Sequence, residues 1–266
     1  GLAIRSKRNS SLITAMQLVR QGEADAVISA GNTGALMGGG LLFLERINGI
    51  KRPALLTVIP GLKGAGTVLL DVGANMDAKP EHLWHYALMG QIYAREVLGK
   101  DNPRVALLNV GNEENKGNIQ VKSAYKLIKE NVNNFVGNME AKEIFQNKTD
   151  VLVCDGFTGN VLLKTIEGMS RDLFAFLYQE ISKDFQARVA LDALQPAIQK
   201  IRATLDESEH GGGLLIGVKG VCFKCHGSSK EKAIMKAILK QVYPFIRKNT
   251  NQKIEEALQQ RSEKTR

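Results

Sequence analysis

Short apolar strands alternate with helices along most of this chain, and most of the strands run into turns rich in glycine and asparagine. Strands that are apolar throughout are typical of parallel pairing, because helices then cover both faces of the sheet. The sequence therefore predicts an open α/β sheet, in which ligands bind beyond the carboxyl ends of the strands. The segments predicted as strands are Ala26–Ala30, Ala54–Ile59, Thr67–Val72, Arg104–Val110, Asn134–Gly137, Asp150–Cys154, Leu214–Val218 and Gly220–Lys224.

Helices are predicted between most of these strands. Pro80 favours a helix start just after it, and we place this helix at about Glu81–Leu98. The stretch 160–210 breaks the cycle, because it has a helical pattern without an intervening strand. The other predicted helices span 35–47, Ile119–Lys129 and Lys230–Ile246. We expect a single α/β domain over residues 1–266, with a long helical insertion over 160–210 and a charged tail over 249–266.

The composition fits a globular chain of 266 residues, 44% of them hydrophobic and 24% charged. No apolar run approaches the ~18 residues of a membrane span, so we do not expect an integral membrane protein. Three cysteines are too few for a secreted scaffold held together by disulfides. The opening residues, GLAIRSKRNSS, lack the apolar core of a signal peptide, so we expect a cytosolic, reducing setting.

The formal net charge of +9 is concentrated at the two ends of the chain. Residues 1–20 carry four basic residues and no acidic ones, and residues 227–266 carry ten basic and four acidic ones. Basic ends on a nearly neutral body indicate either an acidic partner or merely solvated surface. The candidate partners are an acidic protein and an anionic membrane surface. Nucleic acid is the weakest choice, because the chain has one Trp and no run that interleaves basic with aromatic residues.

Four polar turns follow predicted strands, and each combines glycine backbone N–H groups with an asparagine amide near a helix start. Such groups bind anions, phosphate in particular. The alternative interpretation is that any strand-to-helix turn favours Gly and Asn, which tolerate positive φ. We expect all four turns at one edge of the sheet, and that shared position favours an anion site. The turns are Ala30–Gly34, Asp71–Asn75, Asn109–Glu113 and Asp155–Asn160.

Several common site patterns are missing or misleading. No G-x-x-x-x-G-K-[ST] loop, no G-x-G-x-x-G fingerprint between a strand and a helix, and no G-x-S-x-G turn occurs. Cys222–His226 matches the C-x-x-C-H haem pattern, but nothing indicates export, and cysteines three apart on a strand point to opposite faces and cannot share one zinc. Lys116, Lys219 and His226 lie in glycine-rich segments, as candidate site residues or as solvated surface side chains.

Six segments, in order along the chain, resemble the PlsX family, the phosphate:acyl-[acyl carrier protein] acyltransferases of bacterial phospholipid synthesis. They are SAGNTGALM, DVGANMDAKPEHL, LLNVGNEENKG, NFVGNMEAKEIF, DVLVCDGFTGNVLLKTIEG and the stretch from VKGV to KCHGSS. The resemblance runs from KRNSS to the last predicted helix. It implies a three-layer α/β/α fold with a mostly parallel sheet, related to phosphate acetyltransferases and isocitrate dehydrogenases, with a protruding helical hairpin. It also implies a homodimer with no metal or organic cofactor.

Two departures from the family pattern stand out. The family begins with a strand and a D-A-M-G-G-D-like loop that are absent here, and the chain starts with Gly1, so we expect an N-terminally shortened or processed chain. Any substrate contact from that loop would then be missing. The family usually has Ala at the position of Cys225, so we interpret both cysteines of the C-x-x-C pattern as incidental.

The resemblance and the chemistry of the reaction together suggest the site. Phosphate at neutral pH is already an anionic oxygen nucleophile, so the site must position it against a thioester carbonyl and stabilise the oxyanion that forms. Asparagine amides can donate hydrogen bonds to the oxyanion, and lysines can offset the charge of the phosphate. His226 can protonate the departing thiolate. The candidate catalytic residues are Asn75, Lys116, Asn160 and His226. The candidate substrate-binding residues are Asn32, Thr33, Gly34, Asp71, Lys79, Asn109, Gly111, Asp155, Gly156, Thr158, Gly159 and Lys219.

We therefore predict transfer of a fatty acyl group from an acyl carrier protein thioester to inorganic phosphate, giving an acyl phosphate for phospholipid synthesis. One alternative keeps the fold but uses acyl-coenzyme A, as phosphate acetyl- and butyryltransferases do. Another is a non-catalytic protein that binds acyl carriers at a membrane surface. The first candidate for docking an acidic carrier is the basic segment with Lys232, Lys236, Lys240 and Arg247, and Arg5, Lys7 and Arg8 are nearly as suitable.

An apolar stripe lies in the long helical insertion. Its residues recur at spacings of three and four, which places them on one face of a helix, and Pro196 should split that helix in two. A dimer interface or a core stripe is one interpretation. A peripheral membrane contact is the other, which the resemblance supports, and its candidate tip is Leu191, Leu194 and Ile198. The stripe comprises Ala187, Leu191, Leu194, Ile198, Ile201 and Leu205.

Overall fold

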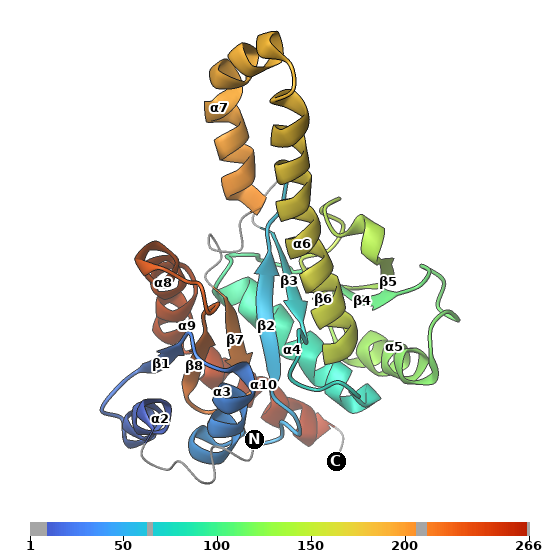
Figure 1. Ribbon diagram of the computed structural model, residues 1–266. Coiled ribbons are helices and arrows are strands. Elements are labelled where there is room, and N and C mark those ends of the chain that lie inside the picture. The colour runs from blue at the N-terminus through green and yellow to red at the C-terminus, as the bar shows by residue number, and fades with distance from the viewer. Residues whose placement is uncertain (1–9, 63–65, 206–211, 265–266) are drawn as a thin grey trace.

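A computed structural model describes residues 10–62, 66–205 and 212–264 and places one eight-stranded sheet between two layers of helices (Figure 1). The predicted three-layer α/β/α fold is confirmed, and so is the existence of each predicted strand, although β5 continues past its predicted end at Gly137 to Glu140. The strands lie in the spatial order β1-β8-β7-β2-β3-β6-β4-β5. Their bounds are β1 Ala26–Ser29, β2 Ala54–Ile59, β3 Thr67–Leu70, β4 Val105–Asn109, β5 Phe135–Glu140, β6 Val151–Val153, β7 Gly213–Ile216 and β8 Val221–Lys224.

The sheet contains two parallel groups that run in opposite directions. β1 pairs with β8 in parallel, and β3, β6, β4 and β5 form the second parallel group. β7 and β2 connect the groups through three antiparallel pairings, so four of the seven pairings in the described sheet are parallel. Because Leu56 of β2 lies opposite Leu70 of β3, β2 begins where β3 ends. We call the edge at which β3, β6, β4 and β5 end the carboxyl edge, and the opposite edge the amino edge.

Alternating side chains divide the core between the two faces of the sheet. Leu56 packs on the first face with α4 and α5, and the neighbouring Leu55 packs on the second face with α6. Cys222 and Cys225 lie in different core clusters, which confirms that they point to opposite faces. The first face carries α4 Pro80–Glu96, α5 Ile119–Asn131, α8 Glu231–Ala237, α9 Tyr243–Arg247 and α10 Thr250–Lys264, and the second carries α2 Ser11–Gln21, α3 Thr33–Gly39 and α6 Gly156–Ile181.

Three short turns complete the helical structure. The predicted helix over 35–47 is α3 followed by a π-helical turn, and the predicted helix over Lys230–Ile246 is α8 and α9 joined by a second one. A 3₁₀ turn follows β5. The predicted tail is helical from Thr250 to Lys264 as α10. The bounds of the turns are Gly40–Leu44 and Ile238–Val242 for the π turns and Ala141–Glu143 for the 3₁₀ turn.

The predicted helical insertion is an antiparallel hairpin of α6 and α7 (Phe185–Leu205) that extends far beyond the sheet (Figure 1). The expected split at Pro196 is wrong, because α7 continues through this residue. Proline removes a single N–H donor, and the packing of α7 along α6 keeps the remaining turns in place. The predicted stripe divides between two sides: Leu191 is 7% exposed, whereas Leu194 is 54% exposed. Ile198 is buried and Ile201 exposed, and the side chain of Leu205 lies outside the described part.

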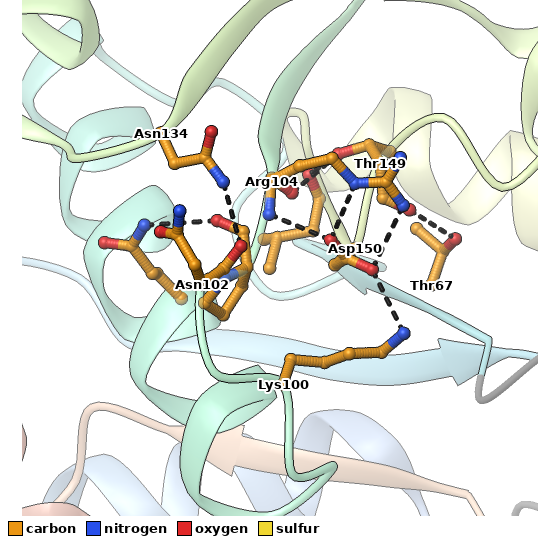
Figure 2. A network of polar contacts seen from close by, with 10 residues as sticks. Thr67, Lys100, Asn102, Arg104, Asn134, Thr149 and Asp150 are labelled. Carbon is orange, nitrogen blue, oxygen red and sulfur yellow. Dashed lines mark hydrogen bonds and ion pairs between the residues drawn. The ribbon is translucent and has the colours of Figure 1, made fainter.

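The amino edge is closed by a network around Asp150, which precedes β6 (Figure 2). Its carboxylate accepts hydrogen bonds from the backbone N–H and the Nε of Arg104, at 2.9 and 3.0 Å, and pairs with Lys100 Nζ at 3.2 Å. The hydroxyl of Thr149 donates to the Arg104 carbonyl, and Thr67 donates to that of Thr149. Burial by itself raises the pKa of Asp150, but the contacts with Arg104 and Lys100 outweigh it and lower that pKa.

Within the described ranges, no helix is long and apolar enough to cross a membrane. The basic residues Arg5, Lys7 and Arg8, which we considered for carrier docking, fall in residues 1–9 and lie outside the described ranges. The structure therefore bears only on the other candidate, the segment from Lys232 to Arg247.

Candidate active site

The loop after β3 is organised around the buried carboxylate of Asp71. Oδ1 accepts the backbone N–H groups of Leu55, Gly73 and Ala74 at 2.9, 3.2 and 2.8 Å, and Oδ2 accepts that of Asn75 at 2.6 Å. Burial raises the pKa of Asp71, and these donors only partly offset that rise. Asp71 therefore shapes the loop, because its oxygens are turned inward onto the backbone rather than toward a substrate.

Asn75 is committed to the same loop. Its Nδ2 donates to the carbonyl of Pro53 at 2.6 Å and to Asp71 Oδ2 at 3.2 Å, so both amide hydrogens have protein acceptors. The Pro53 contact ties the loop to the start of β2. We interpret Asn75 as a positioning residue, since an oxyanion donor needs an amide hydrogen that points at the substrate.

The first turn of α6 packs directly on this loop. Asp155 caps the helix, accepting the Thr158 backbone N–H and hydroxyl at 2.8 Å each. The Gly156 N–H donates to the Asn75 carbonyl at 2.8 Å. A methyl group at Gly159 would lie 2.0 Å from the Asp71 carbonyl oxygen, so only glycine permits this close approach. Asp155, Gly156, Thr158 and Gly159 thus build the contact between the helix and the loop.

Asn160 differs from Asn75 in its environment. It lies one residue further along α6, is exposed, and its amide has no hydrogen-bond partner among the residues that the structure describes. Its Oδ1 is 3.7 Å from the position that a Cβ would take at Gly73, so the side chain lies directly over the loop. Asn160 therefore presents an uncommitted amide at the carboxyl edge.

The turn after β4 lies at the same edge, next to β6. Asn109 holds it closed, because its Oδ1 accepts the Val110 N–H at 2.8 Å and its Nδ2 donates to the Lys116 carbonyl at 3.1 Å. Gly111 is buried within the turn. The exposed ammonium of Lys116 has no acidic partner among the described residues. This turn therefore contributes a cation, while its asparagine is structural.

Two further lysines are placed by the structure. The backbone N–H of Lys79 donates to His82 Nδ1 at 3.1 Å and caps α4, while its side chain is exposed. Lys219 precedes β8 and also lies at the carboxyl edge, but its Nζ is 3.1 Å from Glu45 Oε2. The hydrogen bond from Lys219 lowers the pKa of Glu45. Lys219 is thus held in an ion pair, whereas Lys79 forms none with the residues that the structure describes.

The expectation that all four turns share one edge is wrong for Ala30–Gly34. β1 runs opposite to β3, so this turn follows the sheet's other edge, together with His226 beyond β8. Asn32 caps α3 by accepting the Ala35 N–H at 2.9 Å, and Thr33 and Gly34 form the first turn of that helix. His226 Nδ1 lies 2.7 Å from Ser228 Oγ. The same-edge argument no longer supports a shared site for Asn32, Thr33, Gly34 and His226, which stay predictions from the resemblance.

Sequence patterns did not indicate two residues that border the site. Pro53 accepts the Asn75 amide, and Tyr86 of α4 lies fully buried beside the loop. Burial, and then the charge of Asp71, raise the pKa of the Tyr86 hydroxyl. The periodicity of α4 assigns Tyr86 only to the core, and nothing local shows that Pro53, ahead of a strand, meets a loop that follows one. Among the described residues, no group of His, Cys, Asp and Glu is arranged to hold a metal ion.

Comparison with known proteins places this geometry in context. A family model described as fatty acid synthesis protein matches residues 2–253. A phosphate acyltransferase of Brevibacillus brevis is 48% identical over 257 residues, covering 97% of this chain and 76% of the relative, and one of Geobacillus thermodenitrificans is 51% identical over 236 residues, covering 89% and 72%. The fold is similar to that of a phosphotransacetylase from Streptococcus pyogenes, with a TM-score of 0.61 and 16% identity, over 88% of this chain and 67% of that one.

Proposed function

Since this chain belongs to the PlsX family and is an acyltransferase acting on phosphate, we propose that its donor is a fatty acyl thioester of acyl carrier protein and that its acyl phosphate serves phospholipid synthesis. Membership of a family of enzymes leaves no place for the non-catalytic alternative. The acyl carrier protein as donor, the use of the product in phospholipid synthesis and the roles of individual residues are all part of this proposal.

The observation that carries the proposed mechanism is the uncommitted amide of Asn160 above the Asp71–Asn75 loop. A phosphate oxygen attacks the thioester carbonyl carbon, and the carbonyl oxygen becomes an oxyanion that the Asn160 amide stabilises. The C–S bond then breaks, the electron pair leaves with the sulfur, and the thiolate takes up the proton that the attacking hydrogen phosphate gives up, so the product is the acyl phosphate and the free thiol. Lys79 and Lys116 offset the charge of the attacking phosphate. No step requires a nucleophile from the protein.

The direct test is to incubate the protein with a fatty acyl carrier protein and inorganic phosphate and to trap acyl phosphate with hydroxylamine. We expect trapped product that depends on both phosphate and donor. Replacing the donor with acyl-coenzyme A distinguishes the alternative: a larger kcat/KM for coenzyme A thioesters would contradict the carrier protein as donor. Absence of product from either donor would contradict the proposed reaction.

The basic segment near the C-terminus is the proposed docking surface for the acidic carrier. Lys232 and Lys240 are exposed on α8 and the following π turn, and Arg247 is exposed at the end of α9. Charge attraction of this kind weakens as salt screens it. We expect the KM for the carrier thioester to rise between low and physiological ionic strength in the wild type, and to rise less in a Lys232→Ala, Lys240→Ala variant. Equal salt dependence in both proteins would contradict this surface.

The α6–α7 hairpin is the proposed site of dimer formation and membrane contact. Along its shaft, apolar side chains are more than half exposed, and further ones lie near its turn. Apolar surface of this extent marks an interaction site. The residues are Met169, Leu173, Phe176, Leu194 and Ile201 on the shaft and Phe185 and Val189 near the turn.

The hairpin is tested with exposed residues, because Leu191 and Ile198 are buried and their replacement would unfold it. We expect Leu194→Glu, Ile201→Glu to yield monomers in sedimentation velocity. We expect Phe185→Glu, Val189→Glu to remain dimeric but to lose co-sedimentation with anionic liposomes. A dimeric shaft variant would contradict the interface, and lipid binding by the turn variant would contradict the membrane contact.

A further inference from the structure

The start of β2 lies against the loop that forms the floor of the site. Because β2 is antiparallel to β3, its first residues reach the carboxyl edge, and three contacts join them to the loop. Leu55 N–H donates to Asp71 Oδ1 at 2.9 Å, Val72 N–H donates to the Leu55 carbonyl at 2.9 Å, and Asn75 Nδ2 donates to the Pro53 carbonyl at 2.6 Å. The residue immediately before Pro53 therefore lies at the border of the site.

That residue is Arg52, whose backbone is anchored on both sides. Pro53 is buried, and Arg46 Nη1 donates to the Lys51 carbonyl at 2.8 Å. The neighbouring Lys51 is engaged with Glu81 at 2.5 Å. The Arg52 side chain is exposed and has no acidic partner among the residues that the structure describes.

The charge of Arg52 acts on groups beneath the loop. Burial and Asp71 raise the pKa of the Tyr86 hydroxyl, and the Arg52 guanidinium opposes that rise. Burial lowers the pKa of His82, Glu81 opposes this, and Arg52 adds to the lowering. Tyr86 and His82 both belong to the first turns of α4, which begins at the carboxyl edge. The guanidinium is thus within electrostatic reach of the site.

We propose that Arg52 binds a phosphate group in the acyl-transfer site, an inference that rests on the function proposed above. Arg52, Lys79 and Lys116 are cations at one edge that form no ion pair within the described chain, and a dianion is what they would neutralise together. Arginine differs from the two lysines in offering a planar fork of donors that matches two phosphate oxygens at once. Arg52 thereby orients the phosphate, and the lysines supply charge.

Two substrates can carry this phosphate group: inorganic phosphate, and the phosphopantetheine arm of the acyl donor. Steady-state kinetics of Arg52→Ala and Arg52→Lys separate them when measured with an acyl carrier protein donor and with an acyl-N-acetylcysteamine thioester, which has no phosphate. Arg95→Ala is the matched control, because it also removes an arginine side chain, but at the far end of α4, where Arg95 pairs with Glu96.

If Arg52 holds inorganic phosphate, Arg52→Ala raises the KM for phosphate about 10- to 100-fold with either donor, as expected for loss of a charged hydrogen bond. If it holds the arm, the KM for the carrier thioester rises instead, and the effect vanishes with the N-acetylcysteamine donor. Arg52→Lys retains the positive charge but lacks the planar fork of donors, so its KM should lie between those of the wild type and Arg52→Ala. Unchanged KM values in an active, folded Arg52→Ala variant would overturn the inference, as would equal effects in Arg95→Ala.

A second measurement separates this inference from the proposed reaction. Ligands that bind the native state raise the melting temperature. We expect inorganic phosphate, or 4′-phosphopantetheine compared with pantetheine, to raise that of the wild type and of Arg95→Ala but not of Arg52→Ala. A wild type that forms no acyl phosphate yet shows this pattern contradicts only the reaction. Equal rises in all three proteins contradict phosphate binding by Arg52, whether or not acyl phosphate forms.

Discussion

The two edges of the β3–β6–β4–β5 group each contain a buried aspartate, but the two carboxylates are satisfied in opposite ways. At the amino edge, Arg104 and Lys100 neutralise Asp150, and its pKa is lowered. At the carboxyl edge, Asp71 receives only backbone and amide donors, and its pKa is raised. At the amino edge, these cations hold the strands together. At the carboxyl edge, Lys51 and Lys219 are paired with glutamates, but Arg52, Lys79 and Lys116 form no ion pair among the described residues. This difference separates a structural edge from a site.

The largest effect of a single substitution is expected at Asn160, at the carboxyl edge. Asn160→Ala should lower kcat by roughly 10²–10³-fold, because it removes the uncommitted amide that we assign to the oxyanion. The melting temperature should stay close to that of the wild type, since the exposed side chain has no protein partner among the described residues. Turnover measured with carrier thioester and phosphate tests this. A rate equal to that of the wild type would remove Asn160 from the chemistry.

The next largest effect belongs to the amino edge. Asp150→Asn should lower the free energy of unfolding by about 3 kcal/mol, because it leaves two cations without their buried partner. Since the pKa of Asp150 is lowered in the fold, its contribution is present at neutral pH and disappears as pH falls through that pKa. The difference between variant and wild type in urea unfolding should therefore shrink below about pH 4. A loss of kcat in the folded variant would break the distinction between the edges.

Replacing Asn75 should lower both stability and turnover, each by less than the largest effects expected at Asp150 and Asn160. Asn75→Ala removes two hydrogen bonds inside the loop, which should cost about 1–2 kcal/mol of unfolding free energy. The loop then holds the start of α6 less firmly, and kcat should fall by about 10-fold, less than in Asn160→Ala. Parallel melting and turnover measurements on the two variants give the comparison. A larger kcat loss in Asn75→Ala than in Asn160→Ala would reverse the roles that we assign.

The smallest effect is expected at Thr67, beside the Asp150 network. Thr67→Val keeps the shape of the side chain and removes the hydroxyl that donates to the Thr149 carbonyl at 3.2 Å. Unfolding free energy should fall by about 1 kcal/mol. KM and kcat should be unchanged, because the residue lies at the opposite end of β3 from Asp71. Altered KM for phosphate in this variant would show that the edges are coupled.

Much of the fold could be predicted from local patterns. Apolar runs identified most strands, because a strand covered on both faces excludes polar residues along its length. The exception is the edge strand β5, which contains Asn138 and Glu140. Three of the four polar turns do lie at one edge, and the offset of three between Cys222 and Cys225 was enough to place them on opposite faces. The hairpin was anticipated as a helical insertion, but its continuity through Pro196 was not. Packing between α6 and α7 overrides the local preference of proline.

The candidate site, like the fold, was only partly predictable from the sequence. The sequence by itself determined which residues follow the strands, among them Asp71, Asn75 and Asn160. It could not show that both amide hydrogens of Asn75 are donated to protein acceptors, because one acceptor is the carbonyl of Pro53, 22 residues away in the chain. Nor could it show that the Asn160 amide has no hydrogen-bond partner among the residues that the structure describes.

Strand direction was decided only in the tertiary structure. Hydrophobic periodicity is a local property, and it assigns each residue to a strand and to a face. Whether a strand runs up or down the sheet depends on which distant strand it pairs with. The antiparallel insertion of β7 and β2 between two parallel groups sends the Ala30–Gly34 turn to the amino edge and brings Arg52 to the carboxyl edge. The sequence pattern around Arg52 does not show at which edge Arg52 lies, because the hydrogen bonds that hold the start of β2 at the carboxyl edge come from the loop after β3.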